Sequence, residues 1–133
     1  MHRLEAQILG ALIGVLAVVG FFLEGSLLFE LINVELALDI TRAVLAVALL
    51  AVGLGRFSDT VVRSVMGFVG GVFAAIGVVA LFDPALFGIL SIGMTGFDIG
   101  LHLVVGVAAL ALAVVPERSL GRRPTATPPH QTA

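Results

Sequence analysis

Four polar side chains lie inside otherwise apolar stretches of the chain, where they could carry chemistry. Asp39 and Arg42 are three positions apart, and Asp98 and His102 are four apart. Residues three or four apart share one face of a helix, so each pair is expected to interact. Histidine titrates near neutral pH, so Asp98 and His102 could relay a proton. Alternatively, Asp39, Asp98 and His102 could hold a metal ion.

A purely structural interpretation explains the same residues. Asp39 and Asp98 would cap helix N-termini, where a carboxylate is favoured. Arg42 would pair with an acid, and His102 would bond to a neighbouring helix. The chain has no cysteine, and transition-metal sites favour nitrogen and sulfur ligands. We therefore expect no metal and no cofactor. The rim of the candidate polar site would be formed by Glu24, Glu35 and Asp83.

The composition indicates that lipid surrounds the elements that carry these residues. Of the 133 residues, 59% are hydrophobic and 12% are charged, against about 25% charged in soluble domains. The mean hydropathy is +1.18. Such a chain has too little polar material to cover a soluble surface, and it is too apolar to be disordered over most of its length. A net charge of -2 argues against a nucleic-acid partner.

Four apolar stretches approach the roughly 20 residues that a helix needs to cross a bilayer. In lipid the backbone must satisfy its own hydrogen bonds, which predicts helices. The sequence therefore predicts an all-α membrane protein, a bundle of four transmembrane helices in one domain over residues 1–115. Residues 116–133 are rich in Pro, Thr and Arg, which predicts a disordered cytoplasmic tail. The spans are expected at 4–23, 39–54, 61–82 and 97–115.

The distribution of arginine predicts the orientation. Six of the seven basic residues, all of them arginines, flank the starts of spans one and three or the ends of spans two and four. The positive-inside rule then places both termini, and the loop between spans two and three, in the cytoplasm. The outer connections, 25–38 and 84–96, are apolar but too short to span. They are expected to be interfacial or re-entrant segments, or extensions of neighbouring helices.

The two halves of the chain align with each other, which predicts an internal duplication. Three glycines of the first span match three of the third at an offset of 57, and Asp39 matches Asp98 at an offset of 59. Each unit would contribute two spans, so that residues 4–55 and 61–115 form parallel repeats about an axis near the membrane normal.

Two G-x-x-x-G motifs begin at Gly10 and Gly67 and end at Gly14 and Gly71. Small residues let helices approach closely in lipid, so spans one and three are predicted to touch inside the bundle. The alternative is that these glycines form a homodimer face. Gly106 is expected to serve the fourth span in the same way.

The segment from Asp98 to His102, D-I-G-L-H, followed by Gly106, resembles a motif in a family of small bacterial four-helix integral membrane proteins of unknown function. That family carries an acidic-or-amide, x-x-x, His, x-x-x, Gly pattern at the start of spans two and four. The first half of this chain departs from the pattern, because Ala43 occupies the histidine position and Arg42 is new. The resemblance would cover residues 4–115 and implies no known reaction.

The sequence contains no nucleophile elbow, zinc-protease motif, P-loop or dinucleotide fingerprint. We therefore expect a structural or accessory membrane subunit, and not an enzyme. Its partners would be the lipid bilayer and either further copies of itself or a larger membrane complex. The alternatives are a small proton-coupled transporter with an outward-facing polar site and a subunit that holds a cofactor through His102.

Overall fold

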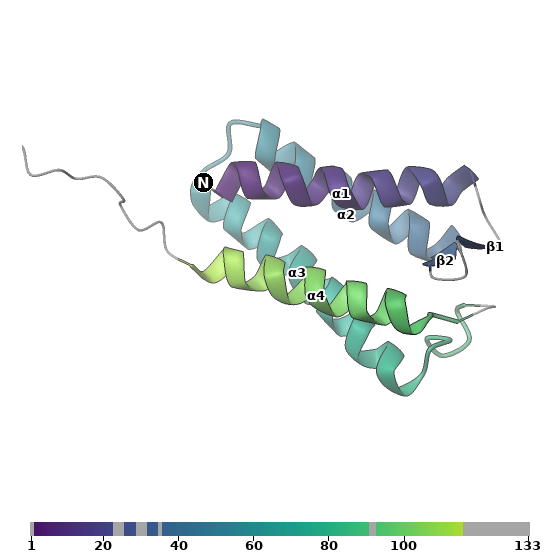
Figure 1. Cartoon of the computed structure of the whole chain (residues 1–133). Coiled ribbons are helices and arrows are strands. Elements are labelled where there is room, and N and C mark those ends of the chain that lie inside the picture. Colours follow the sequence, from purple (N-terminus) through teal and green to yellow (C-terminus); the bar gives the residue numbers. More distant parts are fainter. Residues whose placement is uncertain (1, 23–25, 29–31, 35, 91–92, 116–133) are drawn as a thin grey trace, which may run out of the picture.

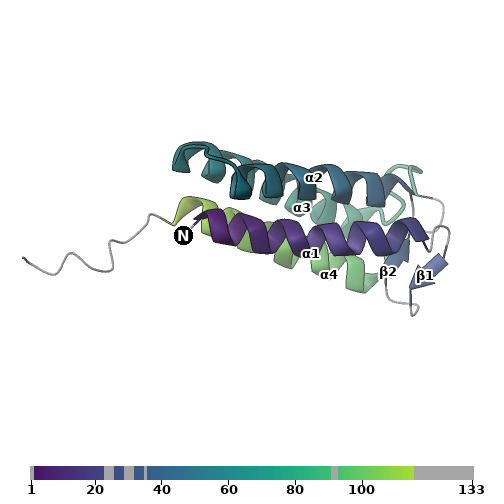
Figure 2. The same cartoon turned by 90° about the horizontal axis from the view of Figure 1, so that it is seen from above.

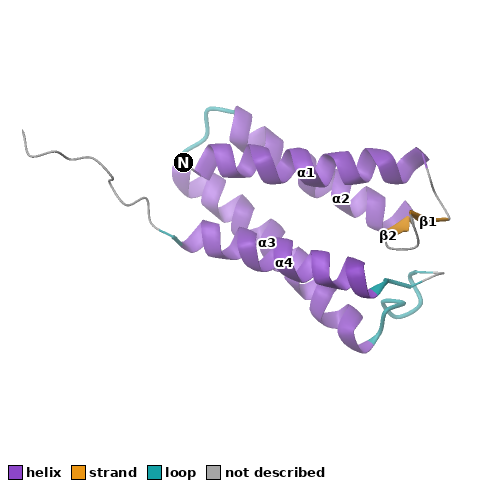
Figure 3. Ribbon diagram, in the orientation of Figure 1, coloured by secondary structure: helices purple, strands orange, loops and turns teal. Residues whose placement is uncertain are grey.

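The computed structural model describes residues 2–22, 26–28, 32–34, 36–90 and 93–115. Its elements are four helices and a pair of short strands (Figures 1 and 3). All four helices are long and apolar enough to cross a membrane, which confirms the predicted architecture of four long helices. The elements are α1 (His2–Phe22), β1 (Ser26–Leu28), β2 (Ile32–Val34), α2 (Leu36–Leu54), α3 (Asp59–Phe82) and α4 (Gly96–Val114).

The helices form two hairpins that lie side by side. In the first hairpin α1 packs along α2, and in the second α3 packs along α4. Figures 1 and 2 show α1 and α4 on one side of the bundle and α2 and α3 on the other. We call the end that carries Arg3, Arg56 and Arg63 the basic end, and the opposite end, with β1 and β2, the strand end.

Burial separates the inside of the bundle from an apolar exterior. Leu49, Met66 and Val69 are fully buried in a core shared by the hairpins. A smaller cluster around Leu38 and Ala80 closes the strand end. The outward faces of all four helices carry large exposed apolar side chains. The bundle is therefore apolar on its outside as well as in its core.

The glycine motifs pack within each hairpin. A Cβ at Gly10 would lie 2.9 Å from the Leu50 side chain, and a Cβ at Gly106 would lie 2.5 Å from the Ala74 backbone nitrogen. Gly14 and Gly67 lie more loosely against Ala46 and Ala113, and a Cβ at Gly71 would meet no atom within 4 Å. Gly10, Gly14 and Gly67 thus face the neighbouring helix of their own hairpin. Helices α1 and α3 do contact each other, as predicted, but the expectation that these glycines form the contact is wrong.

Within the described residues, the two connections at the strand end are mostly not extensions of the neighbouring helices, although α2 and α4 each begin inside the predicted connection. Within residues 25–38, β1 and β2 pair antiparallel, with Ser26 opposite Val34, and α2 begins at Leu36. After α3 the chain turns, and Asp83 Oδ2 accepts a 2.8 Å bond from the Phe87 backbone N–H. Asp83 thus caps a turn. The predicted rim residues Glu24 and Glu35 and the predicted tail, 116–133, lie outside the described residues.

Candidate functional site

The first turn of α2 places a carboxylate against the backbone of α1. Asp39 is fully buried, and a Cβ built on Gly20 of α1 would lie 2.2 Å from its Oδ1. Such a contact is available only because residue 20 has no side chain. The Asp39 carboxylate therefore fills the space that any other residue at position 20 would occupy.

The first turn of α4 holds the second carboxylate through a capping box. Thr95 is the N-cap, and its Oγ1 accepts a 3.1 Å bond from the Asp98 backbone N–H. In return, Asp98 Oδ2 accepts from the Thr95 backbone N–H at 3.4 Å, and it also accepts from the Thr95 hydroxyl at 2.9 Å. The reciprocal bonds satisfy N–H groups that the start of a helix leaves unpaired. They also fix the orientation of the Asp98 carboxylate.

Arg42 joins the two carboxylates across the hairpins. Its Nη1 donates to Asp39 Oδ1 at 3.1 Å, and its Nη2 donates to Asp98 Oδ1 at 3.3 Å. The three residues are at most 2% exposed. Breaking a buried ion pair by removing one partner leaves an uncompensated charge, which is strongly unfavourable. The guanidinium therefore ties the start of α2 to the start of α4.

His102 lies one turn beyond Asp98 on α4 and is 1% exposed. Its Nδ1 is 2.8 Å from the backbone carbonyl oxygen of Asp98. A carbonyl only accepts, so Nδ1 carries the proton and Nε2 of the neutral ring is an acceptor. The imidazole stacks on Phe73 of α3, with ring centroids 4.9 Å apart and an angle of 22° between the planes.

The structure thus brings the four predicted site residues together at the strand end. The imidazole of His102 bonds to the backbone of Asp98 and not to its carboxylate, so the direct carboxylate–imidazole relay is not formed. Among the described residues, no group of three or more His, Asp or Glu is placed to hold a metal ion.

Three residues around the site were not singled out as site residues by the sequence reasoning. Thr95 was detectable, because T-x-x-D before an apolar run is a capping-box signal. Gly20 was noticed as part of the duplication, although nothing in the sequence connects it to Asp39. Phe73 carries no local signal, because a phenylalanine in an apolar span is unremarkable without knowledge of which helix it faces.

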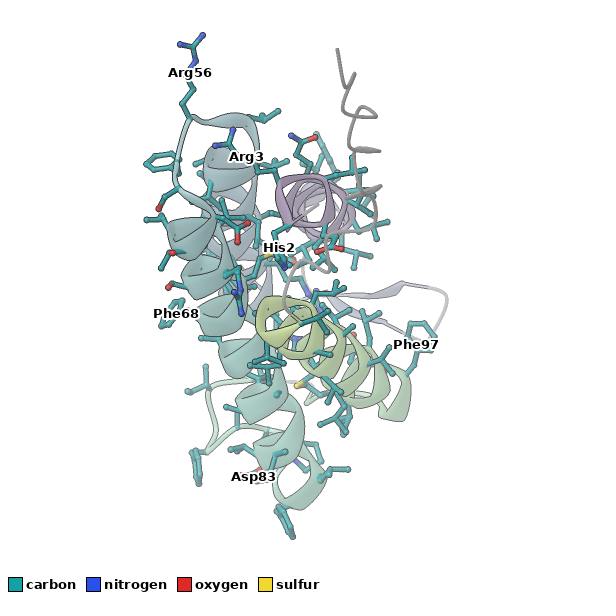
Figure 4. The ribbon with its side chains drawn as sticks, turned by 90° about the vertical axis from the view of Figure 1, so that its left-hand side faces the viewer. His2, Arg3, Arg56, Phe68, Asp83 and Phe97 are labelled. Atoms are coloured by element: carbon teal, nitrogen blue, oxygen red, sulfur yellow. The ribbon has the colours of Figure 1, made fainter. Side chains whose placement is uncertain are left out.

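A second polar network lies at the basic end, where Figure 4 shows His2 among the helix ends. His2 Nδ1 is 2.9 Å from Asp59 Oδ1, and its Nε2 is 3.1 Å from the Val115 carbonyl oxygen. Arg63 Nε donates to the Ala113 carbonyl oxygen at 2.7 Å. The bonds to Val115 and Ala113 satisfy carbonyls at the end of α4, which helix geometry leaves unpaired.

The first hairpin ends in the same manner. Gln7 Nε2 of α1 donates to the Gly53 carbonyl oxygen near the end of α2 at 2.8 Å, and Arg3 Nη2 donates to the Phe57 carbonyl oxygen. In both hairpins, therefore, the first helix supplies the side chain that caps the second.

Comparison with known proteins found no protein family, no curated protein and no solved structure that matches this chain.

Proposed function

We propose that this chain is an integral membrane protein of the bacterial inner membrane that acts as a structural or accessory subunit without catalysis of its own. Its four helices would each cross the bilayer, with both termini in the cytoplasm. The resemblance of the segment from Asp98 to Gly106 to small four-helix membrane proteins agrees with this proposal. The continuous apolar exterior of the helices supports it as well, because water would solvate such a surface poorly.

The observation that carries the proposal is the bridge from Arg42 to Asp39 and Asp98. Its charged groups are used to hold the two hairpins in one arrangement. A charged side chain in the apolar part of a membrane protein is expensive and faces the bundle interior. A bridge of this kind suits a subunit that must present a fixed shape to a partner.

Native gel electrophoresis of mildly solubilised membranes tests the subunit role. We expect the wild-type chain to migrate in an assembly larger than its own monomer. Arg42→Met should dissolve that assembly, and Arg56→Met, which changes an exposed arginine in the α2–α3 connection, should not. A wild-type chain that is monomeric in its native membrane would contradict the role. Proton flux in proteoliposomes that is lost in Arg42→Met would favour the transporter alternative.

The orientation can be tested because the chain has no cysteine of its own. Ser58→Cys places a thiol at the basic end, and Phe87→Cys places one at the strand end, where Phe87 is 82% exposed. A membrane-impermeant maleimide added to intact spheroplasts should label only Phe87→Cys. Labelling of Ser58→Cys alone would show that the topology is inverted.

We also propose that the hairpins are parallel repeats. Asp39 and Asp98 both occupy the first turn of the second helix of their hairpin, and Gly20 and Gly77 both face that helix. Relatives of this chain should retain glycine and aspartate in both registers. A set of relatives in which only one half carries them would contradict the duplication.

A second candidate is a subunit that binds a cofactor through His102. The bond from Nδ1 to the Asp98 carbonyl supports it, because metal-ligating histidines usually donate their other ring nitrogen in this way. Among the described residues the imidazole Nε2 has no hydrogen-bond partner. Protein purified from cells supplied with haem precursors should then show an absorption band that His102→Leu removes. A colourless wild-type protein would contradict this candidate.

A further inference from the structure

A cavity of about 350 Å³ lies at the basic end, between the start of α3 and the end of α4. It combines one guanidinium and two hydroxyls with small or aliphatic residues. Thr60, Arg63, Ser64 and Gly67 follow each other at intervals of three, one and three residues, so they share one face of α3. The lining residues are Thr60, Arg63, Ser64, Gly67, Ala113 and Val114.

The guanidinium of Arg63 is held in place by the end of α4. Its Nε donates to the Ala113 carbonyl oxygen at 2.7 Å, and its Nη2 donates to the Val114 carbonyl oxygen at 3.4 Å. Among the described residues these are its hydrogen bonds, so Nη1 remains available to an acceptor outside the chain. A cation fixed in this way loses little side-chain entropy when it binds an anion.

The surroundings of Arg63 also favour an anion. The exposed hydroxyls of Thr60 and Ser64 can donate, and the N-terminal turn of α3 contributes the positive end of its helix dipole. The negative end of α4 also borders the cavity, but its Ala113 and Val114 carbonyls are bonded by Arg63. The nearest acid on α3 is Asp59, four residues before Arg63, and Asp59 is paired with His2 at 2.9 Å.

Open space lies beside α3 one turn beyond the cavity. A Cβ at Gly67 would touch Ala113 at 3.6 Å, and a Cβ at Gly71, one turn further along α3, would meet no atom within 4 Å. The G-x-x-x-G motif of α3 therefore leaves open surface beside the charged cavity. A polar head above and an apolar surface below correspond to the two parts of a phospholipid.

We propose that this cavity binds the phosphodiester headgroup of an anionic phospholipid, with an acyl chain along Gly67 and Gly71. Basic pockets between transmembrane helices on the cytoplasmic side bind such headgroups in other membrane proteins. A second copy of this chain suits the site less well. In a two-fold dimer the same surface of both copies meets, so the like charges of the two Arg63 side chains would lie at the same depth in the membrane. The proposal rests on the membrane insertion and orientation proposed above.

Native mass spectrometry of the detergent-purified full chain tests the site. The probes are phosphatidylglycerol and phosphatidylcholine with identical acyl chains. We expect the wild type to retain one phosphatidylglycerol about five-fold more strongly than phosphatidylcholine, which is the effect of one basic residue near the surface. Arg63→Gln should remove this preference, and Arg63→Lys should keep most of it.

Two further variants test whether lipid retention depends on this cavity. One removes a different arginine at the same end, and the other fills the cavity. Arg56→Gln removes an exposed arginine at the same end, which points away from the bundle in Figure 4, and should leave the preference unchanged. Gly67→Leu places a branched side chain in the cavity while keeping Arg63, and should abolish retention. Equal binding of the two lipids by the wild type would overturn the proposal, as would an unchanged preference in both Arg63→Gln and Gly67→Leu.

The other occupants give distinct results. Displacement of phosphatidylglycerol by millimolar inorganic phosphate would identify a site for phosphate ions and overturn the lipid assignment. A lipid-independent dimer that Gly67→Leu abolishes would identify a second copy as the occupant. Flotation with phosphatidylcholine vesicles serves as the control for insertion. A chain that does not float contradicts the proposed membrane location, whereas a chain that floats without preferring the anionic lipid contradicts this site alone.

Discussion

The two hairpins place a buried aspartate at the same position but hold it by different means. In the first, Asp39 lies against the bare backbone of α1 at Gly20 and pairs with Arg42 of its own helix. In the second, Asp98 belongs to a capping box with Thr95 and is reached by Arg42 from across the bundle. The first hairpin thus supplies the cation for both carboxylates.

This difference shows how the hairpins depend on each other. If each hairpin neutralised its own aspartate, the two could separate without exposing a charge. Because one guanidinium serves both, separation would leave Asp98 without its cation in an apolar environment, where an isolated carboxylate is costly. Because of this asymmetry, the two hairpins cannot separate without exposing a buried charge.

Arg42→Met should have the largest effect on the contact between the hairpins. It keeps an unbranched side chain of moderate length and leaves both carboxylates without the guanidinium. We expect the free energy of unfolding to fall by about 3–5 kcal/mol, which is the usual effect of breaking a buried pair by removing one partner. Unfolding in mixed micelles with increasing SDS measures it.

The matched variant keeps the shape of the site and removes its charges. In Arg42→Met with Asp39→Asn and Asp98→Asn, most of the lost stability should return, because buried ion pairs are often replaceable by neutral groups. If the triple variant is no more stable than Arg42→Met alone, the charge bridge is not what holds the hairpins together.

Gly20→Ala should have the next largest effect and tests the first hairpin alone. The new Cβ would lie 2.2 Å from Asp39 Oδ1, so the carboxylate must move away from its place beside Arg42. We expect a loss of about 2–3 kcal/mol, at the upper end of the cost of overpacking, measured by the same SDS titration.

Two other glycines provide the comparison for Gly20. Gly71→Ala has open space around it and should be neutral or slightly stabilising, since alanine is the better helix former. Gly77→Ala would meet the Leu103 side chain at 2.8 Å, and part of that contact can be relieved because a leucine side chain can turn. Equal losses for Gly20→Ala and Gly71→Ala would show that the Asp39 contact contributes nothing.

The sequence alone predicted the features that depend on local geometry. Helical spacing brought Arg42 to Asp39, and apolar length predicted four helices whose ends agree closely with the structure. The convergence of the two aspartates could be hypothesised from the repeat. The contact of Asp39 with Gly20 could not be predicted, because it depends on the rotation of α1 against α2. Helices that are apolar all round give little sign of which face is buried.

The same limitation explains the error about the glycine motifs. G-x-x-x-G indicates that a helix is approached closely but does not identify the neighbour. Gly10 is approached by α2 and not by α3. The strands β1 and β2 were also missed, because segments of three residues with no sustained alternation give too short a pattern to predict.

Thr95→Ala should have a smaller effect, confined at first to the second hairpin. The variant removes the hydroxyl that accepts from the Asp98 N–H and donates to its carboxylate. We expect a loss of about 1–2 kcal/mol, the cost of an N-cap replaced by alanine. Ser58→Ala is the matched control, because Ser58 caps α3 with a single 3.4 Å bond at an exposed position. If the two variants lose equal stability, the capping box does not contribute to the buried site.

His102→Phe should have the smallest effect, and it separates structure from function in the second hairpin. The new ring can keep the stack on Phe73, and the Asp98 carbonyl still accepts from the helix backbone four residues on. Since an apolar ring of similar shape replaces the imidazole, and the carbonyl that the imidazole bonds keeps its backbone partner, we expect stability to change by less than about 1 kcal/mol. The first hairpin has Ala43 at the matching position, so an imidazole is not needed to hold such a hairpin together. A loss of stability as large as that of Arg42→Met would mean that His102, like Arg42, is needed to hold the two hairpins together. A small change in stability, together with lost assembly in the native membrane, would assign the imidazole to the proposed role as a subunit.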